Sequence, residues 1–249
     1  MKIAVLGSSS SGNSTYVEIG DVKFLIDVGL GFNDIKDKLF HLGVTADEIN
    51  FILITHAHND HVKCLHSFSR VYDTKIYIGK ETLEEYQKKD LIHNYEFIEN
   101  IDNIMGINIK RIPISHDKKG FGYVIEKDGI TLVYITDTGM IHSRYHEMMS
   151  NKDIYLLESN HDVEMEMTGS KDYMTKIRNT GDMGHLSNDD CARYLNRFVG
   201  RKTKAIMLMH ISEHDNTPDL AFTTNRAVIS DRIPIYLSKK DELSNIIEI

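Results

Sequence analysis

The stretch that decides the fold is Ile52-Leu53-Ile54-Thr55-His56-Ala57-His58-Asn59-Asp60-His61. Its first part is short, apolar and rich in Ile, which predicts a buried strand from Phe51 to Thr55. In extended chain His56 and His58 lie two residues apart, so their imidazoles can point the same way. Asp60 and His61 then fall at the start of a helix and can face a second centre. Imidazole and carboxylate ligands of this kind suit zinc, with iron and manganese as competitors.

The pattern H-x-H-x-D-H directly after an apolar strand resembles the signature of the metallo-β-lactamase-fold hydrolases. This resemblance implies an α+β fold, the four-layer αββα metallo-β-lactamase sandwich, in one domain over residues 1–249. It also implies a dinuclear metal site, with Zn²⁺ as the first choice and Mn²⁺ or Fe as alternatives. One metal would take His56, His58 and His116, the other Asp60, His61 and His210, and Asp137 would bridge them.

The composition is that of an ordinary globular protein, with 41% hydrophobic and 27% charged residues. There is no apolar run near the ~18 residues of a membrane span. The only two cysteines, Cys64 and Cys191, do not indicate a disulfide framework, so we expect a cytoplasmic protein. The net charge of −8 and the scattered Lys and Arg favour a small anionic substrate over a long polyanion. We expect no membrane partner, and a homodimer, the commonest soluble assembly.

Regular elements are predicted along most of the chain. A hairpin is expected from Gly122–Glu126 and Thr131–Ile135 around Asp128-Gly129, because this dipeptide favours a tight turn. Apolar strands are expected at Val22–Ile26, Ile107–Ile114, Ile154–Leu157 and Lys204–Met209, and helices at Asn33–Leu42, Val62–Tyr72, Lys80–Leu91 and Asn188–Phe198. The resemblance places its proposed ligands His116, Asp137 and His210 at or just beyond strand ends.

Two features near the N-terminus have alternative interpretations. The Gly/Ser loop at residues 7–14, with Ser10 and Asn13, could aim N–H groups and hydroxyls at a phosphate or could simply connect a hairpin. Asp27 follows a strand and precedes Gly29. It resembles the family residue that orients the metal-binding loop, and the alternative is a turn cap.

Later motifs resemble one branch of the family, the YycJ/WalJ type. They are Leu-Glu-Ser-Asn-His-Asp at 157–162, Gly-His-Leu-Ser-Asn at 184–188 and Ser-Ser-Gly-Asn at 10–13. Similarity to tRNA 3′-processing nucleases implies that Glu158 orients His185 as a general acid, with Asp60 as the base. His161 and Asp162 could support the metal ligands from behind. Two departures from the family argue against tRNA maturation and mRNA cleavage: the chain lacks the long arm with which tRNA processors grip tRNA, and it has no room for the extra domain of the large RNA-cleaving members.

The chemistry implied is hydrolysis of nucleotide or nucleic-acid phosphodiesters. The acidic charge slightly favours a cyclic mononucleotide phosphodiesterase, an activity that could destroy an immune signal. The alternative is a 5′-to-3′ DNA exonuclease of the YycJ/WalJ type. A thioester or lactone hydrolase, and a non-catalytic scaffold that sequesters a ligand, are further alternatives.

Overall fold

The computed structural model describes residues 1–249, and the chain forms two compact units. Unit 1 comprises Met1–Gly106, Lys118–Phe121 and Lys239–Ile249, and unit 2 comprises Ile107–Asp117 and Gly122–Ser238. No helix combines the length and the hydropathy that crossing a membrane requires. The expected single domain over the whole chain stays a prediction.

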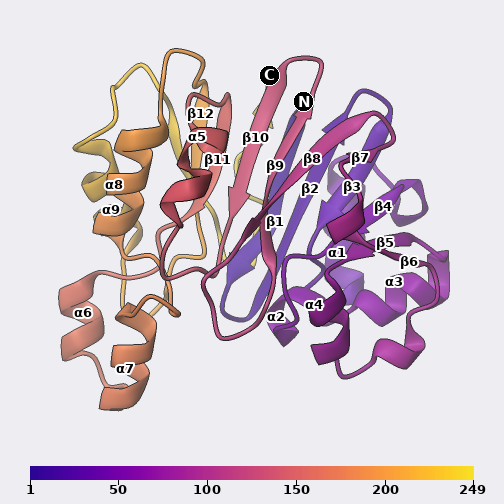
Figure 1. The fold of residues 1–249 in the computed structure, drawn as a ribbon, viewed down its shortest axis with the longest axis horizontal. Coiled ribbons are helices and arrows are strands. Elements are labelled where there is room, and N and C mark those ends of the chain that lie inside the picture. Colours follow the sequence, from indigo (N-terminus) through magenta and orange to yellow (C-terminus); the bar gives the residue numbers. More distant parts are fainter. The chain divides into compact units, whose positions relative to one another are not determined.

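Unit 1 contains a mixed sheet in the order β14-β1-β2-β3-β4-β5-β6 (Figure 1). The strands are β1 (Lys2–Ser9), β2 (Gly12–Ile19), β3 (Val22–Ile26), β4 (Phe51–Leu53), β5 (Lys75–Ile78), β6 (Tyr95–Phe97) and β14 (Ile247–Glu248). The pairs β14-β1, β1-β2 and β2-β3 are antiparallel, whereas β3 to β6 run parallel. A two-residue strand, β7 (Asn103–Ile104), comes near the end of the first segment of unit 1.

In the helices of unit 1 the apolar side chains recur at helical spacing. Each longer helix therefore has one apolar face, which packs against the sheet. The α-helices are α1 (Phe32–His41), α2 (Asn59–Val62), α3 (Leu65–Tyr72) and α4 (Lys80–Glu85), with 3₁₀ turns at Ala46–Glu48, Lys89–Leu91 and Ile98–Asn100. Ile35, Leu39 and Phe68 are fully buried and pack in one core with Leu25 and Ile52 of the strands.

Two expected helices need correction. The helix predicted for Lys80–Leu91 ends at Glu85, because Tyr86 adopts an extended backbone and turns its ring into the core. The helix predicted for Val62–Tyr72 is interrupted: α2 ends at Val62, and α3 begins only after Cys64.

Unit 2 contains strands in the order β13-β12-β11-β10-β9-β8. They are β8 (Ile107–Pro113), β9 (Phe121–Lys127), β10 (Ile130–Ile135), β11 (Ile154–Glu158), β12 (Ala205–Met209) and β13 (Ile235–Leu237). The predicted hairpin is confirmed: β9 and β10 pair antiparallel, and Asp128 and Gly129 both have positive φ, as a type I′ turn requires. From β10 to β13 the strands run parallel.

The helices of unit 2 are α5 (His146–Met149), α6 (Val163–Thr168), α7 (Tyr173–Thr180), α8 (Asn188–Phe198) and α9 (Pro218–Arg226), with a 3₁₀ turn at Ser143–Tyr145. Helix α8 has the predicted bounds, begins at the Ser187 cap and buries Leu195 and Phe198. It packs in one core with Tyr155 of β11 and Ile206 of β12. The sequence did not predict α6, α7 or α9.

Polar residues follow directly where the parallel strands of each unit end. In open sheets of this kind the carboxyl ends of the strands are where ligands bind. Asp27 comes after β3, Asp137 after β10 and His210 after β12, and all three have φ between 53° and 60°. Left-handed backbone is unusual for a residue other than glycine and clusters at functional sites. In each unit the strand ends therefore carry the candidate site residues.

Candidate metal centre

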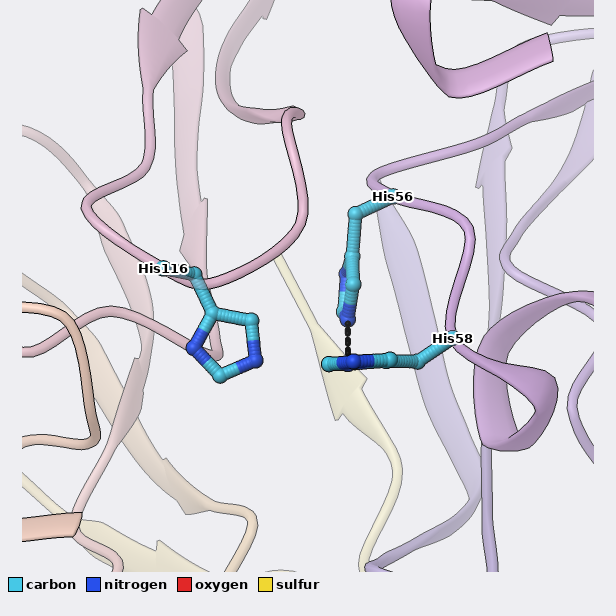
Figure 2. A group of neighbouring side chains, drawn as sticks. All are labelled: His56, His58 and His116. Atoms are coloured by element: carbon cyan, nitrogen blue, oxygen red, sulfur yellow. Dashed lines mark hydrogen bonds between the residues drawn. The ribbon is translucent and has the colours of Figure 1, made fainter. Parts of the chain in front are cut away.

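The loop after β4 carries four of the seven predicted ligands. His56 Nε2 lies 3.0 Å from His58 Nδ1, and the tip of the His56 ring points at the His58 ring, whose plane is nearly perpendicular to it (Figure 2). Residue His56 is anchored by a backbone bridge to Gly120, and its ring is fully buried. His58 precedes α2 as its N-cap, which places Asp60 and His61 in the helical turn, as the sequence predicted.

Asp27 holds this loop from behind. Its Oδ1 accepts a hydrogen bond from the Thr55 N–H at 2.8 Å, and its Oδ2 accepts one from the Thr55 hydroxyl at 2.7 Å. His61 Nδ1 lies 2.8 Å from the same Oδ2. Burial raises the pKa of the Asp27 carboxyl, opposed by the His61 imidazole and the Thr55 hydrogen bonds. With Nδ1 donating to Asp27, Nε2 is the His61 nitrogen left in position to bind a metal.

Asn13 belongs to the Gly/Ser loop and reaches the same residues. Its Nδ2 lies 2.9 Å from the Ser9 carbonyl, 3.1 Å from Asp60 Oδ2 and 3.0 Å from His61 Nε2. An amide nitrogen has two hydrogens, which the Ser9 and Asp60 oxygens can both accept. Ser10 is exposed in the turn between β1 and β2. Within this loop it is Asn13 that contacts Asp60.

Gly29 lets the β3 end and the metal-binding loop approach closely. A Cβ atom at this position would overlap the Asp60 carbonyl group and the His61 nitrogen. The neighbouring Val28 N–H donates to the His61 carbonyl at 2.8 Å. The Asp-Val-Gly sequence thus places the Asp27 carboxylate and the α2 backbone side by side.

In unit 2 the carboxylate of Glu158 is surrounded by four donors. Its Oε1 lies 2.8 Å from both His185 Nδ1 and His210 Nδ1. Its Oε2 accepts from the Thr138 and Leu186 N–H groups, each at 3.1 Å. Burial alone would raise the pKa of Glu158, but the charge of His185 and the hydrogen bonds from both histidines hold it below its ordinary value. Glu158 is therefore an anion at any physiological pH.

Four side chains of unit 2 converge around this carboxylate. The nearest potential ligand atoms of Asp137, Glu158, His185 and His210 all lie within 4.8 Å of one another. Asp137 Oδ1 is 3.5 Å from His210 Nδ1 and 3.8 Å from His185 Nδ1. The Nδ1 atoms of His185 and His210 both donate to Glu158. In each ring Nε2 is therefore the atom that faces a metal or a substrate.

His116 is fixed from the loop that also carries His185. Its Nδ1 lies 3.1 Å from the Gly184 carbonyl, and its ring centroid is 5.1 Å from that of His185. A carbonyl oxygen can only accept, so Nδ1 carries a proton, while Nε2 lies 3.2 Å from Asp117 Oδ1 and is the nitrogen that a metal would have to bind. The Gly-His-Leu-Ser-Asn motif thus has two roles. Its Gly184 carbonyl orients the ring of His116, and its second residue is His185 itself.

The polar residues of the late motifs hold the loops together. The Ser159 hydroxyl donates to Asn188 Oδ1 at 2.7 Å, and Asn216 Nδ2 donates to the same oxygen at 2.9 Å. All three are buried, where an unpaired polar group would be costly. This network ties the loop after β11 to the start of α8 and to the loop after β12. No sequence pattern predicts this network.

Asp162 and His161 could support the metal ligands according to the sequence, and the structure shows what they contact. Asp162 caps α6, its Oδ1 accepting from the Met165 N–H at 2.9 Å. His161 is 1% exposed, and neither of its ring nitrogens has a hydrogen-bond partner. Burial lowers the pKa of His161, which keeps the ring neutral. Its backbone pairs with Ser187 and so joins the Glu158 and His185 loops.

The donors fit divalent metal ions. Carboxylate–histidine pairs such as Asp27–His61 and Glu158–His210 are the usual way in which a protein orients the ring of a metal ligand. The set is nitrogen and carboxylate oxygen without thiolate, which suits zinc and also manganese or iron. Each unit thus contains histidines whose Nδ1 atoms are already held, as metal binding requires.

Comparison with known proteins gives consistent matches. Residues 23–211 match the beta-lactamase superfamily domain. The chain is 34% identical over 231 residues to the exodeoxyribonuclease WalJ of Streptococcus pneumoniae, covering 90% of this chain and 86% of that protein. It is 29% identical over 238 residues to the exodeoxyribonuclease YycJ of Bacillus anthracis, covering 93% and 90%.

Among solved structures, the metallo-beta-lactamase fold protein YhfI from Bacillus subtilis superposes with a TM-score of 0.73 at 18% identity, covering 99% of this chain and 98% of that one. The expected fold class is thereby confirmed.

Proposed function

Because the chain belongs to the metallo-β-lactamase superfamily and is a metal-dependent phosphodiester hydrolase, we propose that it is an exodeoxyribonuclease that degrades DNA from 5′ ends. The observation that carries the proposal is the 34% identity to an exodeoxyribonuclease over 90% of this chain. The pairing of Glu158 with His185 at 2.8 Å supports it, because a phosphodiesterase must protonate its leaving oxygen.

The relatives favour DNA over the cyclic mononucleotide that the net charge suggested. Two curated relatives that span most of the chain are both exodeoxyribonucleases. Net charge summed over a whole chain says little about one surface, since local clusters decide where a polyanion binds. The cyclic-nucleotide activity is therefore the second candidate, supported by the acidic composition alone.

We further propose that the seven predicted ligands hold two divalent ions, with Zn²⁺ as the first choice. His56, His58 and His116 would hold one, Asp60, His61 and His210 the other, and Asp137 would bridge them. When bound, such ions supply Lewis-acid activation of water and stabilise the charge of the phosphate. Homodimer formation and a cytoplasmic location stay predictions from the sequence.

The chain's own residues would move the protons. Asp60, with Oδ2 held by Asn13 at 3.1 Å, would accept the proton of the attacking water. His185 donates through Nδ1 to Glu158, so Nε2 is the atom that would give its proton to the leaving oxygen. The side chain of His185 is 17% exposed, which leaves it accessible to a substrate, whereas Glu158 is fully buried. Glu158 is therefore a positioning residue.

The test compares a linear duplex with a covalently closed circle of the same DNA, using metal-loaded protein. An exonuclease needs an end, so we expect the linear DNA to be degraded and the circle to persist. Parallel substrates labelled at the 5′ or the 3′ terminus give the direction, and early release of the 5′ label is expected. Rapid cutting of the circle, or first release of the 3′ label, would refute a 5′ exonuclease.

A further inference from the structure

Beside the metal-binding loop of unit 1 lies a pocket of about 260 Å³. Ala57, His58 and Asn59 form one wall, so the pocket begins at a predicted metal ligand. The segment after α4 forms the opposite wall with Tyr86, Gln87 and Lys88. Its volume lies just below the ~300–1,000 Å³ of small-ligand sites, so a single nucleotide is about the largest ligand that it could hold and a duplex is too large.

The pocket has a positively charged rim. Lys63, Lys88 and Lys118 all line it, and Glu85 is the only acidic side chain that does. Lys118 is paired with Glu85 at 3.3 Å, whereas Lys63 and Lys88 form no ion pair. These three lysines come from separate segments of a chain whose net charge is −8, so they do not stand out in the sequence. Clustered lysines beside a reaction centre attract a phosphate.

Two apolar side chains line the pocket beside the lysines. Val62 and Tyr86 are buried there, and a sugar or base can pack on such side chains. Burial together with the positive charges of Lys88 and Arg70 lowers the pKa of His66, whose ring lies 3.4 Å from the Tyr86 hydroxyl. The pocket therefore suits a ligand with an anionic head and a small apolar body.

We propose that this pocket binds the 5′-terminal nucleotide of DNA, with Lys63 and Lys88 holding its 5′-phosphate. The inference rests on the proposed exonuclease function and deepens it. A pocket for one terminal phosphate beside His58 would measure one nucleotide from the end and position the next phosphodiester at the metal centre. It would explain why an end is required.

The experiment compares kcat/KM for duplexes that carry a 5′-phosphate or a 5′-hydroxyl. Charge-assisted hydrogen bonds from two lysines predict a preference of the wild type for the phosphate of ~10- to 100-fold. The double variant Lys63→Gln/Lys88→Gln should bring this ratio close to one. The matched variant Lys36→Gln/Lys110→Gln removes the same charge from exposed positions outside the pocket and should keep the wild-type ratio.

A binding measurement separates this inference from the function on which it rests. Metal-free protein is titrated with thymidine 5′-monophosphate and with thymidine, by calorimetry. The pocket predicts tighter binding of the monophosphate, lost in the double lysine variant and kept in the matched variant. Equal binding of the monophosphate and of thymidine would refute phosphate binding by the pocket, as would an equal ratio of rates in the wild type and the double lysine variant. Failure to degrade any DNA, with monophosphate binding intact, would instead refute the exonuclease function.

Discussion

Replacing Glu158 with Gln should disable the centre although the two side chains have the same shape. Four donors point at the carboxylate, namely His185 Nδ1, His210 Nδ1 and the N–H groups of Thr138 and Leu186. A carboxamide has one acceptor oxygen, so in either orientation two donors face an NH₂ group. Each buried donor left unsatisfied costs ~1–3 kcal/mol, so the native state loses ~2–6 kcal/mol of a total stability of ~5–15 kcal/mol.

The histidines can avoid part of this cost by moving their protons to Nε2. His210 would then lose the nitrogen that we expect to bind a metal, and loss of such an orienting partner weakens metal affinity by ~10- to 100-fold. Glu158→Gln is therefore expected to lower metal affinity, or stability, or both. A competition titration with a chromophoric zinc chelator measures the first, and urea unfolding of metal-free protein measures the second.

The control is Glu147→Gln, an exposed residue of the same unit. The pKa of Glu158 is held below its ordinary 4.5, so its stabilising effect is full above pH 4.5 and is lost as the pH falls below that value. The stability difference between the wild type and Glu158→Gln should narrow over that range. Unchanged zinc affinity together with an unchanged urea midpoint would refute the role given to Glu158.

Three further predictions concern the same centre. His185→Ala should keep the bound metal but lower kcat by ~10²- to 10⁴-fold, which is the usual contribution of a general acid. Metal analysis checks the first expectation and steady-state kinetics the second. An unchanged kcat would show that His185 takes no part in the proton transfer. Asp27→Asn should weaken metal binding by ~10- to 100-fold, since His61 loses its carboxylate partner; the exposed Asp128→Asn serves as its control in the zinc titration, and equal affinities would contradict the prediction. Removing metal with a chelator should abolish hydrolysis, and adding Zn²⁺ or Mn²⁺ should restore it; activity that survives complete removal, verified by metal analysis, would contradict a metal-dependent reaction.

The sequence predicted much of the fold because its strands are short apolar runs that end abruptly in polar residues. The β4 strand, the β9–β10 hairpin and helix α8 all have local signals: an apolar run, an Asp-Gly turn and a serine cap. Helices α6, α7 and α9 have weak signals, since each buries only one or two side chains. Apolar periodicity cannot reveal a helix that contributes so little to the core.

Contacts between distant segments could not be predicted in the same way. Asn13 donates a hydrogen bond to Asp60, which lies 47 residues later in the chain. This contact depends on how the pairing of β2 with β3 positions the Gly/Ser loop. Glu158 was expected to orient His185, and the structure adds His210 as a second partner that no sequence spacing indicates. A further signal is visible only in the backbone: the positive φ of Asp27, Asp137 and His210.

The most direct test of the central claim offers metal-loaded protein an equimolar mixture of 5′-phosphorylated linear duplex DNA and cyclic mononucleotides. The Asp60→Ala protein serves as the blank. We predict that the DNA shortens from its 5′ ends while the cyclic nucleotides persist. Loss of the cyclic nucleotides with the DNA left intact would contradict the account, and would identify the protein as a small-nucleotide phosphodiesterase built on the same metal centre.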